Sequence, residues 1–217
     1  MAELRAFAAA AALLASTVVA VPLPQAGADE CPDVELVFAR GTGEPPGPGR
    51  VGQALADTLI PMLGGRSLSV YGVNYPAGIN FLNTGSGATD AENHMAAVAT
   101  ACPATRFVLG GFSQGAAVVS MLAGVPPLGN RIGNFGSAPP LPPESAGRIA
   151  AAAVFGNPGN RFGTPLSTTG AFAGRAIDLC SDGDPICVVG GRDRAAHNIY
   201  EFPPFITDAA GFVAGRV

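Results

Sequence analysis

Residues 107–122, FVLGGFSQGAAVVSML, place a serine between an apolar run and a stretch of helix-forming residues. Ser113 has glycine two positions away on each side, and the helix-forming stretch begins directly after it. This strand–turn–helix context is that of a nucleophile elbow, in which a sharp turn exposes the serine hydroxyl. The chain has 30 glycines among 217 residues, so the spacing alone is also compatible with a structural serine. The context therefore favours a nucleophile and predicts a strand followed at once by a helix.

Apolar runs of the same kind recur along the chain. Five of them are apolar nearly throughout, as is typical of a parallel sheet covered on both faces. They are VELVFA (34–39), SLSVYGV (67–73), RFVLGG (106–111), RIAAAAVFG (148–156) and RAIDLC (175–180). Helical patterns lie between them at 51–63, at 88–102, where Thr89 and Glu92 suggest a capping box, and at 113–122. The alternation predicts a single-domain, three-layer α/β/α fold around a central, mostly parallel five-stranded sheet.

Two segments rich in proline or glycine, 124–148 and 157–174, interrupt this alternation. Ligands of α/β sheets bind beyond the carboxyl ends of the strands, where such segments lie. We expect them to be loops that shape a cleft, with a surface excursion as the alternative.

The N-terminal segment has the layout of a secretory signal peptide. An apolar run, 6–21, is followed by the small residues of 26–28, and cleavage is expected after Ala28. Glu3 weakens the basic character that such a leader usually has, so a retained N-terminal anchor is the alternative. The run is short for a stable membrane span, and none is expected.

The chain thus divides into a leader, 1–28, and one domain, 29–217. We expect a secreted, extracellular monomer, with association with the cell envelope left open. All 12 basic residues are arginines, and they are scattered without a basic run or interleaved aromatic residues. No nucleic-acid partner is therefore expected.

Four cysteines fit an exported chain with two disulfides. Cys180 and Cys187 are close enough in sequence to close a short loop, which leaves Cys31 to pair with Cys102. A zinc site is the alternative, but the chain has no C-x-x-C motif. We expect neither a metal nor a cofactor.

A serine nucleophile needs a base, and the chain has only two histidines. In enzymes with a nucleophile elbow the chain order is serine, acid, histidine, so the base must follow Ser113. His197 meets this condition. His94 precedes the serine, in a predicted helix beside Met95, and is interpreted as a structural residue.

The acid that orients the histidine must also follow the serine. The candidates are Glu144, Asp178, Asp182, Asp184 and Asp193. Asp178 lies inside a predicted strand, and Asp193 is too close to His197 in sequence to reach round its ring. Asp182 and Asp184 both lie in CSDGDPIC (180–187), a loop that a disulfide would make rigid. These arguments leave both open, with a preference for Asp184.

Several motifs together point to a known family. They are VFARGTGE (37–44), VNYPA (73–77), GGFSQGA (110–116), DLCSDGDPIC (178–187) and the late His197. On these motifs the chain resembles the cutinases and the actinobacterial cutinase-like serine esterases of the α/β-hydrolase superfamily, from Cys31 onward. The resemblance implies that the acid is the aspartate of C-x-x-x-D-x-x-C, which is Asp184, and it implies the same two disulfides.

The resemblance also implies an oxyanion hole built from the backbone N–H groups of Thr42 and Gln114. Many members have serine at the first position, and the extra methyl of Thr42 would narrow the site. An open, lidless site with apolar flanking loops is implied as well. The candidate substrate contacts are Ile79, Phe81, Leu82, Val188 and Val189, with ordinary packing as the alternative. The segment 124–148 is longer and richer in proline than in the fungal members, which puts a polymeric substrate in doubt.

These expectations converge on one activity. The resemblance implies a secreted serine esterase that hydrolyses short- to medium-chain carboxylic esters or lipids through Ser113, His197 and Asp184. Two alternatives stay open. One is an acetylxylan-type esterase with the same fold and motifs, and the other is a catalytically idle surface protein that acts as an antigen.

Overall fold

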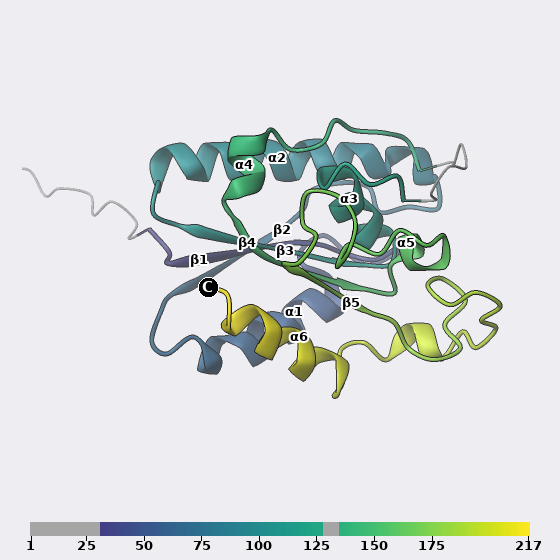
Figure 1. Cartoon of the computed structure of the whole chain (residues 1–217). Helices are drawn as coiled ribbons and strands as arrows, with labels where there is room; N and C mark the ends of the chain where they lie inside the picture. Colours follow the sequence, from purple (N-terminus) through teal and green to yellow (C-terminus); the bar gives the residue numbers. More distant parts are fainter. Residues whose placement is uncertain (1–30, 128–134) are drawn as a thin grey trace, which may run out of the picture. The chain divides into compact units, whose positions relative to one another are not determined.

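Five parallel strands form one sheet in the computed structural model of the chain, which describes residues 31–127 and 135–217 (Figure 1). The predicted leader and part of the 124–148 segment lie outside the described residues. The strands are β1 (Val34–Ala39), β2 (Leu68–Gly72), β3 (Arg106–Phe112), β4 (Ile149–Phe155) and β5 (Ala176–Leu179), in the order β2-β1-β3-β4-β5. Every neighbouring pair is parallel, as the apolar runs predicted.

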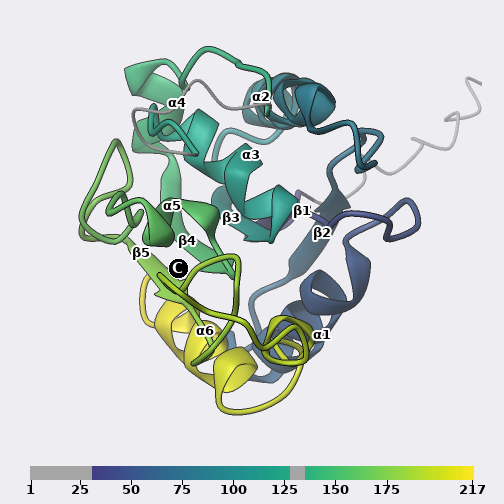
Figure 2. The same ribbon diagram turned by 90° about the vertical axis from the view of Figure 1, so that its right-hand side faces the viewer.

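Helices cover both faces of the sheet (Figures 1 and 2). On one face lie α1 (Gly49–Leu59) and α6 (Phe205–Ala214), and on the other lie α2 (Thr84–Ala101), α3 (Gln114–Leu122) and α4 (Pro143–Gly147). Alternate residues of β1 supply the two cores, because successive side chains of a strand point to opposite faces. Leu36 and Phe38 belong to the core with α1, and Val37 and Ala39 belong to the core with α2. The three-layer α/β/α prediction is confirmed.

Short elements follow the strands at the carboxyl edge of the sheet. They are the single turns η2 (Phe81–Asn83) and η3 (Ala196–Asn198), and the short helix α5 (Pro158–Arg161), whereas the single turn η1 (Ile60–Met62) directly follows α1 and precedes β2. Helices α4 and α5 lie within the two segments that were predicted to be loops. Among the described residues, no helix is long and apolar enough to cross a bilayer.

The predicted start of the second helix was wrong. Helix α2 begins at Thr84, and Thr89 lies inside it, with its hydroxyl donating back to the carbonyl of Gly85 at 3.4 Å. The glycines in this first part lower the intrinsic helix propensity, which concealed the true start. They are needed for close packing, since a Cβ on Gly85 would lie 2.4 Å from the carbonyl oxygen of Ser137.

Both predicted disulfides are present. Cys31 and Cys102 have Cα atoms 5.5 Å apart and tie the segment before β1 to the end of α2. Cys180 and Cys187 have Cα atoms 5.9 Å apart and close the loop after β5. Both distances are normal for a disulfide. The second bridge fixes a loop at the carboxyl edge of the sheet.

Candidate active site

Ser113 occupies the single residue between β3 and α3. Its φ of 55° and ψ of −111° lie in a region that residues with a side chain rarely adopt. The flanking glycines make this turn possible. A Cβ on Gly115 would lie 1.8 Å from the carbonyl oxygen of Ala39, and one on Gly111 would lie 2.3 Å from the carbonyl oxygen of Gly115. The G-x-S-x-G spacing is therefore a steric requirement of the elbow.

His197 lies between the serine and an acid. Its Nε2 is 2.8 Å from the Ser113 Oγ, and its Nδ1 is 2.8 Å from the Asp184 Oδ2. With Nδ1 donating to the carboxylate, Nε2 is free to accept the serine proton. The end of β4 makes room for the ring, because a Cβ on Gly156 would lie 2.8 Å from the His197 Cε1. The structure thus brings the three predicted residues into one hydrogen-bonded chain.

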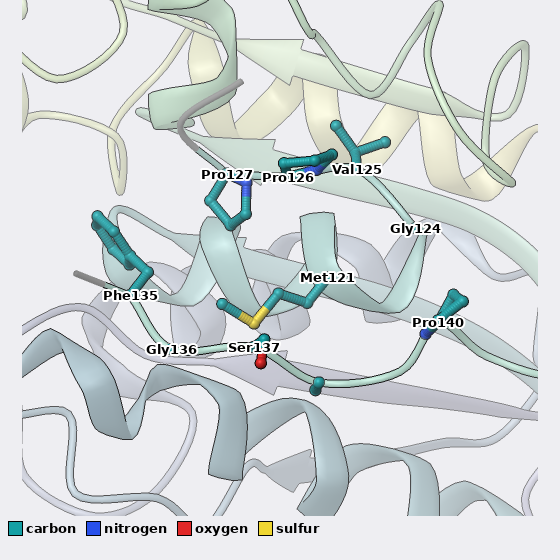
Figure 3. A pocket seen from close by; sticks show the side chains of 10 residues that line it. Met121, Gly124, Val125, Pro126, Pro127, Phe135, Gly136, Ser137 and Pro140 are labelled. Atoms are coloured by element: carbon teal, nitrogen blue, oxygen red, sulfur yellow. The ribbon is translucent and has the colours of Figure 1, made fainter. Parts of the chain in front are cut away.

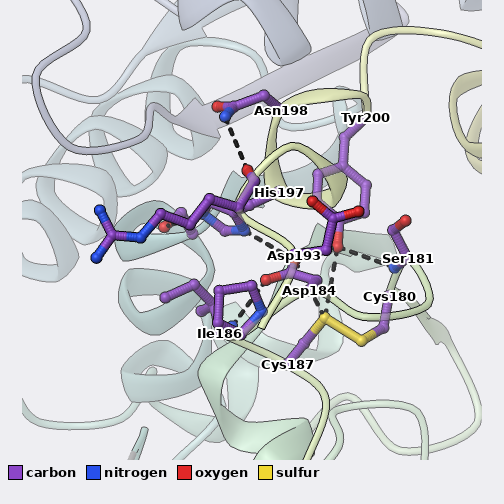
Figure 4. A network of polar contacts seen from close by, with 12 residues as sticks. Cys180, Ser181, Asp184, Ile186, Cys187, Asp193, His197, Asn198 and Tyr200 are labelled. Carbon is purple, nitrogen blue, oxygen red and sulfur yellow. Dashed lines mark hydrogen bonds and ion pairs between the residues drawn. A yellow bond between two sulfur atoms is a disulfide. The ribbon is translucent and has the colours of Figure 1, made fainter. Parts of the chain in front are cut away.

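Asp184 is fully buried and is held by three donors (Figure 4). Its Oδ1 accepts from the Ile186 amide at 2.7 Å, and its Oδ2 accepts from His197 and from the hydroxyl of Tyr200. Burial disfavours the charged form, but the hydrogen bonds from His197, Tyr200 and Ile186 outweigh it and lower the pKa of Asp184. The carboxylate is therefore charged and fixed in position.

Two of the rejected acids, Asp178 and Asp193, accept hydrogen bonds elsewhere in the structure. The carboxylate of Asp178 accepts hydrogen bonds from Asn157 and from two backbone amides, Leu166 and Ser167. That of Asp193 accepts from the amide of Ala195, and Asp182 is exposed. His94 contacts Glu35 at 3.1 Å and stacks on Tyr71 with ring centroids 3.5 Å apart.

Tyr200 was missed in the sequence analysis. Its side chain is buried, and its hydroxyl accepts from the Ser181 amide at 3.0 Å and donates to the Asp184 Oδ2 at 2.5 Å. Burial is the main cause that raises its pKa, and the hydrogen bond to Asp184 adds to it. Because the hydroxyl oxygen accepts from a backbone amide, its proton is directed at the carboxylate. The only signal in the sequence is a tyrosine three residues after the histidine.

The predicted oxyanion residues meet through their side chains. The Thr42 hydroxyl donates to the Gln114 Oε1 at 2.9 Å, and the Gln114 Nε2 donates to the Thr84 Oγ1 at 2.9 Å. The Thr84 hydroxyl in turn donates to the Phe81 carbonyl at 2.7 Å. Gln114 is also the first residue of α3, so its backbone N–H has no acceptor within the helix. A row of hydrogen bonds thus links the loop after β1 to the first turn of α3 and the start of α2.

The loop that carries Thr42 is held by Arg40 and Glu44. The buried Arg40 guanidinium donates to the carbonyls of Glu44, Val73 and Tyr75. The Glu44 carboxylate accepts from the Gly41 amide at 2.6 Å. Sequence analysis did not single out either residue, although both lie in the motif VFARGTGE.

A cavity of about 550 Å³ opens over the serine. Ser113, His197, Thr42 and Gln114 line it, together with apolar side chains that include Phe81, Phe112, Phe135, Phe162 and Ile186. Of the predicted substrate contacts, Phe81 alone is among its lining residues. Ile79, Leu82 and Val189 are exposed, at 88%, 59% and 77%, and Val188 is half-buried outside the lining. The other apolar side chains come from the end of β3, from the segments 124–148 and 157–174, where a cleft was predicted, and from the loop after β5.

Comparisons with known proteins agree on one family. The family model described as Cutinase matches residues 30–217. "Probable carboxylesterase Culp3" of Mycobacterium tuberculosis (strain ATCC 25618 / H37Rv) is 47% identical over 215 residues, which cover 96% of this chain and 80% of that protein. "Phospholipase Culp4" of the same strain is 47% identical over 211 residues, which cover 96% of this chain and 89% of that protein.

Solved structures show the same architecture. Trichoderma reesei cutinase in complex with a phosphonate inhibitor is 34% identical with a TM-score of 0.67, covering 85% of this chain and 76% of that one. The catalytic core of acetyl xylan esterase from Trichoderma reesei is 22% identical with a TM-score of 0.72, covering 87% of this chain and all of that one (100%). At that identity the second likeness concerns the fold alone.

Proposed function

The chain belongs to the cutinase family of carboxylic ester hydrolases, and on this premise we propose that it is a secreted serine esterase that works through Ser113, His197 and Asp184. One observation carries the proposal. The Ser113 Oγ, the two ring nitrogens of His197 and the Asp184 Oδ2 form a continuous chain with both contacts at 2.8 Å. A nucleophile within hydrogen-bond reach of a base that is itself oriented by a carboxylate is the arrangement that acyl transfer requires.

The first half of the reaction forms an acyl-enzyme. The Ser113 Oγ attacks the ester carbonyl carbon while its proton passes to the His197 Nε2. The carbonyl oxygen becomes an oxyanion, which the backbone N–H groups of Thr42 and Gln114 stabilise. The tetrahedral intermediate then expels the alcohol, whose oxygen takes the proton from His197, and the acyl group remains on the serine.

The second half releases the acid. A water molecule takes the place of the alcohol and gives a proton to the His197 Nε2 as it attacks the acyl carbon. The Ser113 oxygen leaves and recovers that proton. Asp184 stays charged throughout and favours the imidazolium form that appears in each half-reaction. The low pKa of Asp184 supports this role.

We propose short- to medium-chain carboxylic esters or lipids as substrates. The cavity over Ser113 has aromatic walls formed by Phe81 and Phe135, which suit an alkyl chain. An acetylxylan-type esterase is the alternative within the same fold, and it would prefer acetyl to longer acyl groups. A catalytically idle surface protein is less favoured, because Ser113 and His197 lie in reactive geometry.

Export is part of the proposal. The leader at 1–28 would direct secretion, and two disulfides suit an oxidising compartment. Secretion is tested by N-terminal sequencing of protein recovered from the culture medium. A chain that begins at Asp29 supports cleavage after Ala28, and a chain retained in cells with its leader contradicts it.

The catalytic proposal is tested with p-nitrophenyl esters from acetate to decanoate, using the wild type and the Ser113→Ala variant. The wild type should turn over with a maximum at butyrate or a longer chain, and the variant should be slower by at least about a thousandfold. A folded wild type with intact disulfides that is no faster than the variant on any ester would contradict the proposal. A sharp preference for acetate would favour the acetylxylan-type alternative.

A further inference from the structure

A second cavity of about 310 Å³ lies between the end of α3 and the segment 135–140 (Figure 3). Among the described residues that line it, Met121, Val125 and Pro127 are buried and apolar, and Ala138 is half-buried. In Figure 3 the side chains of Phe135 and Pro140 lie on opposite sides of Met121. An apolar cavity of this size suits an alkyl group and offers few partners for water.

The wall between this cavity and the catalytic one contains the side chain of Phe135. Phe135 lines both cavities, and its ring stacks on that of Phe81 with centroids 5.0 Å apart. The main chain beside it packs closely against the segment before α2, because a Cβ on Gly136 would lie 2.1 Å from the Leu82 carbonyl oxygen. The aromatic ring is therefore the part of this wall that a rotation about side-chain bonds can move.

The direction of the acyl chain follows from the positions of the proposed base, His197, and of the wall that contains Phe135. The base must protonate the alcohol oxygen, so the alcohol of the ester lies on the side of His197. That side is next to α1, where the Arg50 Nη1 lies 3.4 Å from the carbonyl oxygen of Asn198. Phe81 opens the turn η2 that leads into α2, which covers the opposite face of the sheet (Figure 2). The acyl group, bonded to the same carbon as the alcohol, therefore points towards Phe81 and Phe135.

We propose that the cavity bounded by Met121, Phe135 and Ala138 binds the distal methylene groups of long acyl chains, and that Phe135 controls entry to it. This inference rests on the proposed function, because it takes the acyl carbon to be at Ser113. Short acyl groups end within the catalytic cavity, whereas longer ones displace the Phe135 ring and continue beneath it. Each methylene group buried in this way strengthens binding by at most about fourfold.

Two substitutions change the second cavity in opposite directions. Ala138→Leu fills it, and Phe135→Ala opens the wall. The readout is the ratio of kcat/KM for p-nitrophenyl decanoate to that for p-nitrophenyl butyrate, measured below the micellar concentration of either ester. Ala138→Leu should lower this ratio at least about fivefold, and Phe135→Ala should raise it at least about threefold. Phe202→Ala removes the same ring from an exposed site outside both cavities and should leave the ratio unchanged.

A second substrate series separates the acyl side from the alcohol side. Acetate esters of butanol and decanol differ in the alcohol alone, and neither cavity variant should change their ratio. Unchanged ratios for the acyl series in both variants, or equal shifts in both series, would overturn the inference. If the wild type hydrolyses no ester, or Ser113→Ala keeps its activity, the proposed function itself fails. Normal butyrate turnover with an unaltered chain-length ratio would refute the role of the second cavity alone.

Discussion

Tyr200→Phe removes one hydroxyl from the buried network behind the proposed base. The ring should stay in place, since it packs against Phe112, Phe155 and Phe205 with centroids 5.1 to 6.1 Å away. What is lost is the 2.5 Å hydrogen bond to Asp184 and the acceptor for the Ser181 amide. A hydrogen bond to a charged group contributes about 1.5–3 kcal/mol, and we expect the free energy of unfolding at pH 7 to fall by about 2 kcal/mol.

The sign of the pH dependence follows from the lowered pKa of Asp184. A carboxylate whose pKa is lower in the folded state stabilises the fold at pH values above its unfolded pKa of about 3.9. This stabilisation is lost as the pH falls through the folded pKa. Tyr200→Phe removes one of the hydrogen bonds that lower the pKa of Asp184. The difference in the free energy of unfolding between wild type and variant should therefore have its full size at pH 7 and should become smaller below about pH 4. Urea unfolding at a series of pH values measures it.

Catalysis should change in a characteristic way. A carboxylate that has lost a donor holds the protonated imidazole of His197 more strongly, so the acid limb of the kcat/KM profile should move to higher pH. We expect this shift in direction together with a fall in kcat of about tenfold. The assay is p-nitrophenyl butyrate hydrolysis between pH 5 and 9.

Tyr71→Phe is the matched control for this experiment. The Tyr71 hydroxyl also donates to a carboxylate, the Asp90 Oδ2 at 3.0 Å, but neither residue lines the catalytic cavity. It should leave the acid limb in place. If Tyr200→Phe loses stability while its acid limb coincides with those of the wild type and Tyr71→Phe, the hydroxyl supports the fold without tuning the base, and the reasoning is refuted.

Three further changes test other parts of the site. Thr84→Val removes the acceptor of the Gln114 side chain and should lower kcat about tenfold with KM nearly constant, as measured by steady-state kinetics on butyrate esters. Gly156→Ala places a Cβ 2.8 Å from the imidazole of the proposed base at a φ of 57° and should lower kcat about a hundredfold, as single-turnover kinetics would show. Replacing Cys31 and Cys102 together by serine should lower the free energy of unfolding by up to about 4 kcal/mol in urea, with little change in kcat at 25 °C.

Each of these three has an outcome that contradicts its premise. A large rise in KM for Thr84→Val would place the threonine in substrate binding. Wild-type kcat in Gly156→Ala would mean that the ring tolerates displacement. If the double serine variant loses much of its kcat at 25 °C as well as its stability, the first disulfide supports the geometry of the site itself.

The strands and the chain order of the proposed triad could be read from the sequence because they depend on recurring patterns. Runs that are apolar on both faces are typical of buried parallel strands, and the elbow imposes glycines close to Ser113 in sequence. Because the chain has only two histidines, His197 was left as the predicted base. The choice of the acid could not rest on a local pattern, because Asp182 and Asp184 lie in the same loop. The structure distinguishes them, since Asp184 is buried and Asp182 is exposed.

The parts that could not be predicted depend on contacts between distant segments. Tyr200 supports Asp184 through a hydrogen bond that becomes visible only when the loop after β5 packs beneath the segment of η3. Gly156 is required by the position of the imidazole, which the chain reaches 41 residues later, at His197. The apolar residues Ile79 and Leu82 look like pocket residues in sequence but are exposed, whereas Phe135 lies in a proline-rich segment that gave no such signal.

The central claim is that Ser113 is the nucleophile of this ester hydrolase. The most direct measurement is labelling with a p-nitrophenyl alkylphosphonate, in which the serine oxygen displaces p-nitrophenol and forms a stable phosphonyl ester. The account predicts release of one equivalent of p-nitrophenol, an adduct on the peptide that contains Ser113, and parallel loss of esterase activity. His197→Gln should slow the labelling by orders of magnitude. An adduct on another residue, or full activity after stoichiometric labelling of Ser113, would contradict the account.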